Sequence, residues 1–235
     1  MQISGIPFLK ERGLYMVHIF DVDNTLIKRT SAWYFLQEAL RQNIIHFSQI
    51  LHLPFEWIRY KLGRPNLDFI ENTIKHLAGL AKDTLERTAL SCFEQRIKPN
   101  IYSDGIRLVR EAQQRNEKVI FATSSLCTLI QPIEAFFNIE GSIASALEFR
   151  DGVTTGRILG NSVFGHKKKT AIQAWLNENG LRPDEACFYS DSYTDLPLLE
   201  FCGRPVAVNP DRILLREAKK RRWEIMNFTK TLGRM

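Results

Sequence analysis

The chain has 235 residues, of which 44% are hydrophobic and 25% charged, so its composition is that of a soluble globular protein with one large domain or a core with one insertion. It contains no run of 18 apolar residues and no H-E-x-x-H histidine spacing, which excludes a membrane-spanning helix and argues against a zinc site. The formal net charge of +6 comes without a long lysine or arginine block and without a nucleic-acid-reading motif, so we predict no nucleic-acid partner.

Four cysteines lie far apart in the sequence and form no C-x-x-C pair: Cys92, Cys127, Cys187 and Cys202. No secretory signal precedes them, so the pattern indicates reduced thiols and a cytoplasmic protein. Residues 1–15 have mixed polarity and no hydrophobic period, and we expect an N-terminal extension there with no assigned role.

A predicted strand at residues 17–20 leads directly into two aspartates. Its apolar side chains are followed by Asp21 and Asp23, at a spacing of two. Two carboxylates crowded at a strand end raise at least one pKa unless they share a cation or a proton. A D-x-D pair is a weak signal by itself, since surface turns also contain it, and its meaning depends on the rest of the chain.

From residue 30 to about residue 100 the sequence is helical in character, with no convincing strand. Apolar residues recur at helical spacing after a candidate cap at Ser31 and again after Asn66. We therefore predict a helical cap domain at residues 30–100, inserted into an α/β core made of residues 16–29 and 101–235.

Within this insert, residues 47–64 are rich in aromatic side chains and end in cations. Two interpretations stay open. Phe55, Trp57 and Tyr60 either pack the core of the insert or form an amphipathic face that contacts a membrane surface or an apolar substrate.

The next elements predict half of a βαβ crossover. Residues 103–116 have a helix-start signature and an apolar stripe, and residues 118–123 form a buried-strand pattern. This strand ends in three hydroxyls: Thr123, Ser124 and Ser125. Ser125 fits a cap for a helix at residues 126–137, whereas Thr123 is well placed to bind an anionic oxygen.

The remaining elements place more charged groups around a third strand. An Asp-Gly pair at residues 151–152 indicates a hairpin or tight turn. The sequence GHKKK precedes a helix at residues 170–179. By itself, such a lysine run is typical of a solvent-exposed surface. Residues 186–190 then form a strand pattern that is followed by Asp191 and Asp195.

In an open parallel α/β sheet, active sites form at the carboxyl ends of the strands. Five polar side chains are predicted there or at the start of a following helix: Asp21, Asp23, Thr123, Lys168 and Asp191. The set fits phosphoryl transfer, which uses a nucleophilic carboxylate, a hydroxyl and an ammonium that hold phosphoryl oxygens, and a nearby acid. Hard oxygen ligands without soft ones favour Mg²⁺ over zinc as the metal that neutralises the phosphate charge.

The order of these motifs resembles that of the haloacid dehalogenase-like (HAD) hydrolase superfamily. The matching segments are DVDNT at residues 21–25, Thr123 in FATSS, Lys168 in GHKKK, and DSYTD at residues 191–195. The likeness extends from residue 17 to the C-terminus and is greatest for the helical-cap subfamily IB, which includes phosphoserine phosphatase. The resemblance implies a doubly wound, mostly parallel Rossmann-like sheet with an inserted helical cap.

The resemblance also implies roles for the acidic residues. Asp21 would attack phosphorus and form an aspartyl-phosphate, while Asp23 would protonate the leaving alcohol and then activate water. Mg²⁺ would be bound by the side chains of Asp21 and Asp191 and by the backbone carbonyl of Asp23. Asp195 would support the metal shell or the lysine.

By the same resemblance, Thr123 and Lys168 would hold the phosphoryl oxygens. Lys168 is preferred over its neighbours because of the G-x-x-K spacing and because Ile172 and Trp175 would then lie on the inner face of the helix; Lys169 is the alternative. Further supporting positions in the first two motifs are Thr25 and Ser124.

Two departures from phosphoserine phosphatases bear on the substrate. Those enzymes usually have a glutamate soon after the first motif, where this chain reads LIKRTS at residues 26–31, and Ser-Gly-Gly at the second motif, where it reads Thr-Ser-Ser. The resemblance therefore implies a Mg²⁺-dependent phosphomonoester hydrolase for a small phosphorylated metabolite, with phosphoserine disfavoured. No pattern indicates an oligomeric state.

Two alternatives use the same aspartyl-phosphate. One is a membrane-surface phosphatase of a phospholipid headgroup phosphate, such as phosphatidylglycerol phosphate, with peripheral membrane contact through residues 47–64. The other is a phosphotransferase that passes the phosphoryl group to an acceptor alcohol. A catalytically silent binding module is disfavoured, because every expected polar position is filled.

Overall fold

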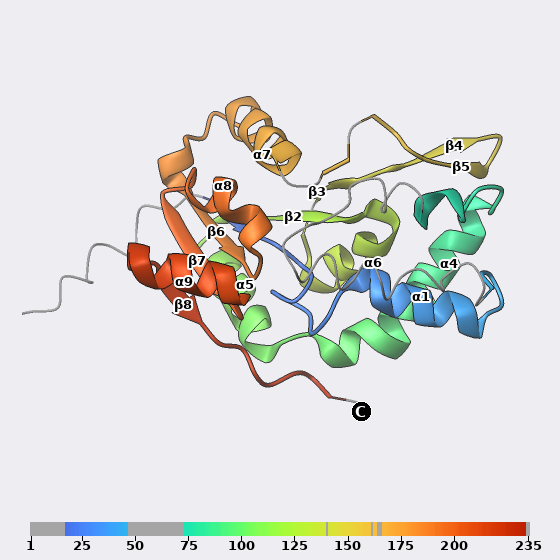
Figure 1. Cartoon of the computed structure of the whole chain (residues 1–235), viewed down its shortest axis with the longest axis horizontal. Coiled ribbons are helices and arrows are strands. Elements are labelled where there is room, and N and C mark those ends of the chain that lie inside the picture. Colours follow the sequence, from blue (N-terminus) through green and yellow to red (C-terminus); the bar gives the residue numbers. More distant parts are fainter. Residues whose placement is uncertain (1–16, 47–72, 140, 161, 164–165, 234–235) are drawn as a thin grey trace, which may run out of the picture.

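The computed structural model describes residues 17–46, 73–139, 141–160, 162–163 and 166–233. Within them, a six-stranded parallel sheet has the strand order β3-β2-β1-β6-β7-β8 (Figure 1). The strands are β1 (Val17–Phe20), β2 (Lys118–Leu126), β3 (Ser142–Ser145), β6 (Ala186–Ser190), β7 (Arg204–Val208) and β8 (Glu224–Met226). The predicted α/β class with a parallel sheet and a helical insert is confirmed.

Strand β1 lies inside the sheet, with β2 on one side and β6 on the other. All four of its residues, His18 included, are buried, as expected for an inner strand of a parallel sheet covered on both faces. The register aligns Phe20 with Phe121 of β2 and with Tyr189 of β6. Because parallel strands end on the same edge, the residues that follow these three strands gather at that edge.

Five helices cover the two faces of the sheet: α5 (Ser103–Gln114) and α6 (Cys127–Phe137) on one face, and α7 (His166–Glu178), α8 (Leu196–Leu199) and α9 (Arg212–Arg221) on the other (Figure 1). Along β1 the side chain of Phe20 packs into the first layer, whereas Val17 and Ile19 pack into the second. This alternation follows the period of two along a strand and makes the sheet doubly wound.

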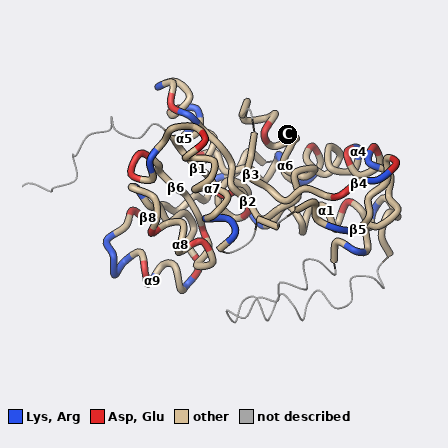
Figure 2. The backbone as a smooth tube through the Cα atoms, turned by 90° about the horizontal axis from the view of Figure 1, so that it is seen from above, with Lys and Arg blue, Asp and Glu red and all other residues tan. Residues whose placement is uncertain are grey.

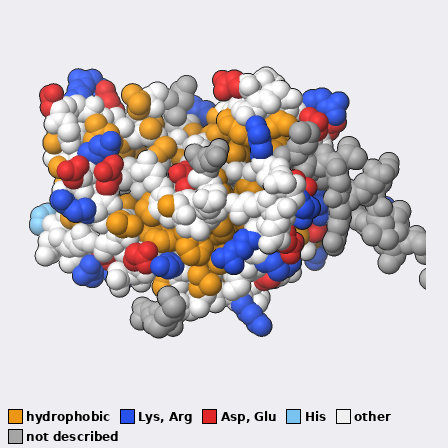
Figure 3. Space-filling model, turned by 180° about the vertical axis from the view of Figure 1, so that it is seen from behind, with side chains coloured by type: hydrophobic (Ala, Val, Ile, Leu, Met, Phe, Trp, Pro, Cys, Tyr) orange, Lys and Arg blue, Asp and Glu red, His pale blue; other side chains and the backbone are white. Residues whose placement is uncertain are grey.

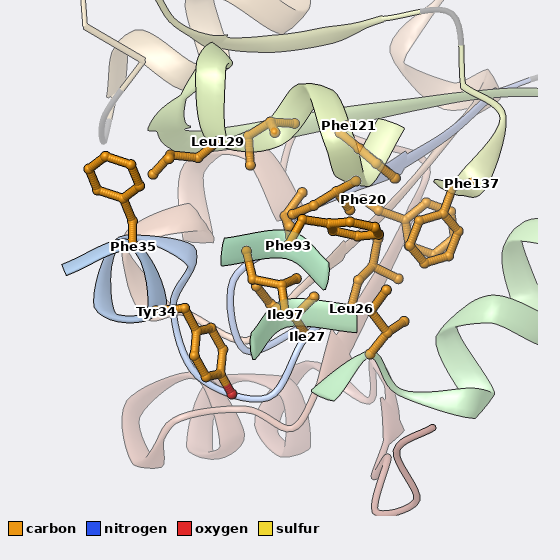
Figure 4. Close-up of a cluster of buried hydrophobic side chains, with 14 of the residues drawn as sticks. Phe20, Leu26, Ile27, Tyr34, Phe35, Phe93, Ile97, Phe121, Leu129 and Phe137 are labelled. Atoms are coloured by element: carbon orange, nitrogen blue, oxygen red, sulfur yellow. The ribbon is translucent and has the colours of Figure 1, made fainter. Parts of the chain in front are cut away.

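The insert after β1 contributes α1 (Ser31–Arg41), α4 (Lys82–Cys92), a π-helical turn η2 (Phe93–Ile97) and a 3₁₀ turn η3 (Lys98–Asn100). Its apolar side chains share one hydrophobic cluster with the α5–α6 face of the sheet, as Figure 4 shows for Phe35, Phe93 and Phe121. The predicted cap bounds at residues 30 and 100 stay a prediction. The aromatic segment 47–64 lies outside the described residues.

A buried carboxylate joins the helices of the insert. Glu38 of α1 is fully buried and accepts hydrogen bonds from the side chains of Arg41, Gln42, Ser91 and Arg96. These hydrogen bonds, that of Arg41 foremost, outweigh burial and hold the pKa of Glu38 well below the usual glutamate value. The cluster connects α1 with α4 and η2.

Strands β4 (Leu147–Arg150) and β5 (Val153–Ile158) form an antiparallel hairpin outside the main sheet. Asp151 and Gly152 have positive φ angles of 49° and 79°, the conformation that two-residue hairpin turns require. The turn predicted at residues 151–152 is confirmed.

The hairpin also contacts the insert. The Gly79 N–H donates to the Thr154 carbonyl over 2.8 Å, and the Thr154 N–H donates to the Leu80 carbonyl over 2.9 Å. At Gly156 an added Cβ would lie 2.9 Å from the Cβ of Ala78, so only glycine permits this close approach.

Helix α9 is rich in basic residues. Helix α9 carries five of them within ten residues: Arg212, Arg216, Lys219, Lys220 and Arg221. Figure 2 shows α9 at the opposite end from the insert.

In the part of the chain that the structure describes, no helix is long and apolar enough to cross a membrane. The four cysteines form no disulfide and are free thiols.

Candidate active site

The chain turns tightly after β1 and places Asp21 and Asp23 at the carboxyl edge of the sheet. The Asp21 N–H donates to the Tyr189 carbonyl over 2.9 Å, which keeps this residue in register with β6. Asn24 then adopts a left-handed φ of 57°, a conformation that asparagine tolerates better than most residues. Thr25 is fully buried, and its hydroxyl lies 3.5 Å from an oxygen of the largely buried Asp21 carboxylate.

A lysine from helix α7 lies against this aspartate. Lys168 is 2% exposed, and its Nζ donates to Asp21 Oδ1 and to Asp195 Oδ2, both over 2.8 Å. Asp195 also accepts a 2.7 Å hydrogen bond from the Ser190 hydroxyl. Burial by itself lowers the pKa of Lys168, but the charges of Asp195 and Asp21 outweigh it and raise that pKa above the usual lysine value. The ammonium therefore stays charged.

The alternative lysine lies elsewhere. Lys169 Nζ is 5.0 Å from the centroid of the Phe201 ring, a cation–π contact on the flank of α7. The structure thus brings Lys168 to Asp21 and places Lys169 at Phe201, and the roles predicted for the two lysines stay predictions.

The acidic residues at this edge raise one another's pKa. Burial raises the pKa of Asp21 to about 7, with Lys168 opposing the shift and the charges of Asp195 and Asp23 adding to it. Burial and then the charges of Asp21 and Asp195 raise the pKa of Asp191 well above the usual aspartate value. One lysine does not neutralise the whole cluster, so the edge favours an additional cation.

Asp23 is held through both of its carboxylate oxygens. The Ser31 N–H donates to Oδ1 over 2.8 Å, and the Ser125 hydroxyl donates to Oδ2 over 2.9 Å. The two serine hydroxyls are themselves 2.6 Å apart. Burial raises the pKa of Asp23, and the hydrogen bonds from Ser31 and Ser125 oppose that rise.

The hydroxyl residues at the end of β2 differ in their burial and in their hydrogen bonds. Thr123 is 1% exposed, and its Oγ1 accepts a 3.2 Å hydrogen bond from the Ser125 N–H. Since Phe121 pairs with Phe20, Thr123 lies at the same sheet edge as Asp21. The half-buried Ser124 makes no side-chain hydrogen bond to any described residue.

A surface hollow elsewhere is separate from this edge. It has a volume of about 690 Å³ and is lined by residues of α5 together with Lys98, Phe136 and Leu232. None of the predicted site residues lines it.

Figure 3 shows the face of the molecule opposite to Figure 1, where apolar side chains gather in a band between charged ones.

Comparison with known proteins decides the family. The haloacid dehalogenase-like hydrolase family profile matches residues 19–200, which include both aspartates after β1, the β2 hydroxyls, Lys168 and the acidic turn after β6. The chain belongs to the haloacid dehalogenase-like hydrolase family. It is accordingly a HAD-family phosphatase, since its curated relatives include phosphatases that it matches over 97% and 70% of their lengths.

Two curated relatives and one solved structure illustrate the likeness. The chain is 32% identical over 216 residues to the histidinol-phosphatase of Neisseria meningitidis, covering 89% of this chain and 97% of that protein. It is 29% identical over 214 residues to the phosphoserine phosphatase SerB1 of Mycobacterium tuberculosis, covering 89% and 70%. A Bordetella pertussis protein of unknown function has the same fold, with a TM-score of 0.81 and 27% identity over 90% of this chain and 98% of that one.

The donor set of this HAD site fits a magnesium ion. Asp21 and Asp191 supply hard carboxylate oxygens at adjacent strand ends, and no described residue donates a hydrogen bond to the Asp191 carboxylate. Among the described residues no group of three or more His, Cys, Asp or Glu side chains forms a metal cage. Mg²⁺ is typically bound by one or two carboxylates, with water and substrate phosphate oxygens as the other ligands.

Two residues at Asp23 were missed by the sequence reasoning. Ser31 and Ser125 were interpreted as helix caps, and both interpretations are wrong. Thr30 caps α1 by accepting from the Trp33 N–H, and α6 begins at Cys127 with Leu126 as its N-cap residue and no side-chain cap. The sequence feature that could have pointed to Ser125 as a partner of Asp23 was the run of three hydroxyl residues at the end of β2.

Proposed function

We propose that this HAD-family phosphatase hydrolyses a small phosphomonoester through an aspartyl-phosphate on Asp21, with Asp23 as acid and base. The observation that carries the proposal is the buried Lys168 ammonium, 2.8 Å from Asp21 Oδ1. A buried ammonium favours the ionised, nucleophilic form of that carboxylate, although burial alone raises its pKa. It also provides a fixed positive charge where phosphoryl oxygens arrive.

The reaction proceeds in two displacements. An Asp21 oxygen bonds to phosphorus while the bond from phosphorus to the alcohol oxygen breaks, and Asp23 gives its proton to that oxygen. Asp23 then takes a proton from a water molecule as the water oxygen bonds to phosphorus and the Asp21–phosphorus bond breaks. The products are an alcohol and inorganic phosphate, and both aspartates return to their initial states.

Other residues at the edge hold the phosphoryl group. The Thr123 hydroxyl and the Lys168 ammonium would bind its oxygens, and Asp195 keeps the ammonium in place. A magnesium ion would be held by Asp21, Asp191 and the Asp23 carbonyl, and would neutralise charge on the phosphoryl oxygens.

L-histidinol phosphate is the first substrate to test. The support is the 32% identity to a histidinol-phosphatase over 97% of that protein's length. Phosphoserine is the second, because SerB1 is also a relative. It ranks lower because residues 26–31 contain no carboxylate to hold the substrate amine in the way that phosphoserine phosphatases do.

The test is phosphate release from a panel of L-histidinol phosphate, phosphoserine, sugar phosphates, nucleotides and dispersed phosphatidylglycerol phosphate, with Mg²⁺ or EDTA. We expect turnover of a small soluble phosphomonoester that requires Mg²⁺ and disappears in Asp21→Asn. Activity that survives Asp21→Asn would contradict the mechanism. Preference for the lipid substrate would instead support the membrane-surface alternative.

Hydrolysis and phosphotransfer are separated by product analysis. With glycerol added as acceptor, a hydrolase releases one inorganic phosphate for each alcohol released, whereas a phosphotransferase forms glycerol phosphate at the expense of inorganic phosphate. We expect the first result.

A further inference from the structure

Two serines from distant parts of the chain meet at the carboxylate of Asp23. Ser31 is the first residue of α1 in the insert, and Ser125 lies near the end of β2, 94 residues away. Their hydroxyl oxygens are 2.6 Å apart, and Ser31 is fully buried. A buried hydroxyl that faces a second hydroxyl and a carboxylate forms a directed chain of hydrogen bonds.

The direction of this chain follows from counting protons. Each serine hydroxyl has a single proton to donate. Ser125 donates its proton to Asp23 Oδ2 over 2.9 Å, so the proton shared between the two hydroxyls must come from Ser31. The order is therefore from the Ser31 hydroxyl to Ser125, and from Ser125 to Asp23.

The backbone of Ser31 holds the other oxygen of Asp23. Its N–H donates to Oδ1 over 2.8 Å and belongs to the first turn of an 11-residue helix. N–H groups in that turn have no partner within the helix and favour a negative charge nearby. The Asp23 carboxylate is thus held from the insert on one side and from the sheet on the other.

We propose that Ser31 and Ser125 are positioning residues that fix the Asp23 carboxylate for proton transfer to the leaving alcohol oxygen. The proposal rests on the function proposed above. Proton transfer requires the carboxylate oxygen within hydrogen-bond reach of the leaving oxygen, and small displacements of a catalytic group are costly to the rate. A side chain held at both oxygens cannot rotate about its χ2 bond without losing hydrogen bonds.

The test compares substrates that differ in their need for a proton. An alkyl phosphate must receive a proton as its alcohol leaves, whereas the nitrophenolate of p-nitrophenyl phosphate leaves without one. The alkyl probe is L-histidinol phosphate or phosphoserine, whichever the wild type hydrolyses faster. The variants are Ser125→Ala, Ser31→Ala and the double variant, with Thr155→Ala as a hydroxyl-deletion control on the β4–β5 hairpin.

We expect Ser125→Ala to lower kcat/KM for the alkyl phosphate by about tenfold or more, which is a part of the rate effect of a general acid. For p-nitrophenyl phosphate we expect kcat/KM to change by less than about twofold, because its leaving group needs no proton. Ser31→Ala keeps its N–H and acts only through Ser125, so its effect is smaller. The double variant matches Ser125→Ala, because residues that act in series are not additive. Thr155→Ala matches the wild type on both substrates.

Three results would overturn the proposal. Equal losses on both substrates would mean that the serines support phosphate binding or folding and not proton transfer. Unchanged kinetics in Ser125→Ala would mean that the contact has no catalytic effect. A wild type that hydrolyses neither p-nitrophenyl phosphate nor any phosphomonoester of the panel above with Mg²⁺ present would reject the proposed function, and this proposal with it.

Discussion

Lys168 donates a 2.8 Å hydrogen bond to Asp21 although 147 residues separate them in the sequence. The contact ties the first turns of α7 to the end of β1. Because the lysine side chain is 2% exposed and the aspartate 9%, water and salt screen the two charges weakly.

Replacing Lys168 by methionine removes this charge while keeping most of the side-chain volume. We expect at least an approximately 100-fold loss of kcat/KM, because a preorganised positive charge at the phosphoryl group is lost and the nucleophile becomes easier to protonate. Lys167→Met, at an exposed position of the same helix, is the matched control and should retain activity. A comparable loss in Lys169→Met, with no loss in Lys168→Met, would contradict the assignment of this role to Lys168.

Asp191→Asn tests the proposed magnesium site through stability as well as activity. A carboxyl whose pKa is raised in the folded state lowers the free energy of unfolding at pH values above its unfolded pKa. We therefore expect the variant to melt at a higher temperature than the wild type in EDTA at pH 8. The wild type should gain thermal stability on addition of Mg²⁺, and the variant should gain much less. Equal magnesium-induced shifts would place the metal elsewhere.

The buried Glu38 cluster predicts a pH-dependent contribution to stability. Glu38→Gln leaves the Arg41 and Arg96 partners without a counter-charge, and we expect a loss of about 3 kcal/mol in the free energy of unfolding at pH 7. The exposed pair of Glu94 and Lys98 supplies a control, because Glu94→Gln should cost less than about 1 kcal/mol. Urea denaturation measures both.

The sign of the pH effect follows from the lowered pKa of Glu38. Its stabilisation is fully present above the usual glutamate pKa of 4.5 and is lost as the pH falls toward the lower folded-state value. The difference between wild type and Glu38→Gln should therefore narrow below about pH 4.5. A difference that stays constant from pH 7 to pH 3 would show that shape, and not charge, makes the cluster stabilising.

Gly156 and Gly160 form a matched pair for the contact between the hairpin and the insert. Both have positive φ, 72° and 69°, but a Cβ on Gly156 would meet Ala78 at 2.9 Å, whereas one on Gly160 would meet nothing within 4 Å. Alanine at either position carries a similar backbone cost of about 1–2 kcal/mol. We expect Gly156→Ala to be the more destabilising by at least about 1 kcal/mol in thermal or urea unfolding. Equal effects would mean that the hairpin moves away from the insert at no cost.

The sequence predicted the parts of the site that depend on strand ends. Asp21 and Lys168 could be placed because parallel strands share one carboxyl edge and because a helical period fixes which lysine faces inward. The turn at residues 151–152 could be placed because an Asp-Gly pair adopts positive φ locally. These features depend on a few neighbouring residues.

The parts that could not be predicted depend on distant contacts. Ser31 and Ser125 each stand where a local helix cap is the commoner role of a serine, and only the folded chain brings them to Asp23. The pairing of Thr154 with Gly79 and Leu80 likewise joins two segments that show no matching pattern in the sequence. Strand β8 is a three-residue edge strand, too short to have a hydrophobic period.

The most direct measurement asks whether Asp21 carries the phosphoryl group during turnover. The enzyme is mixed with its best phosphomonoester and Mg²⁺, quenched in acid within the first turnover, and reduced with borohydride, which converts an aspartyl-phosphate to homoserine. Peptide mass spectrometry then locates the change. Homoserine at position 21 in the wild type, and its absence in Asp21→Asn, is the result predicted; steady release of phosphate with residue 21 unmodified, or a modification at another residue, would contradict the account.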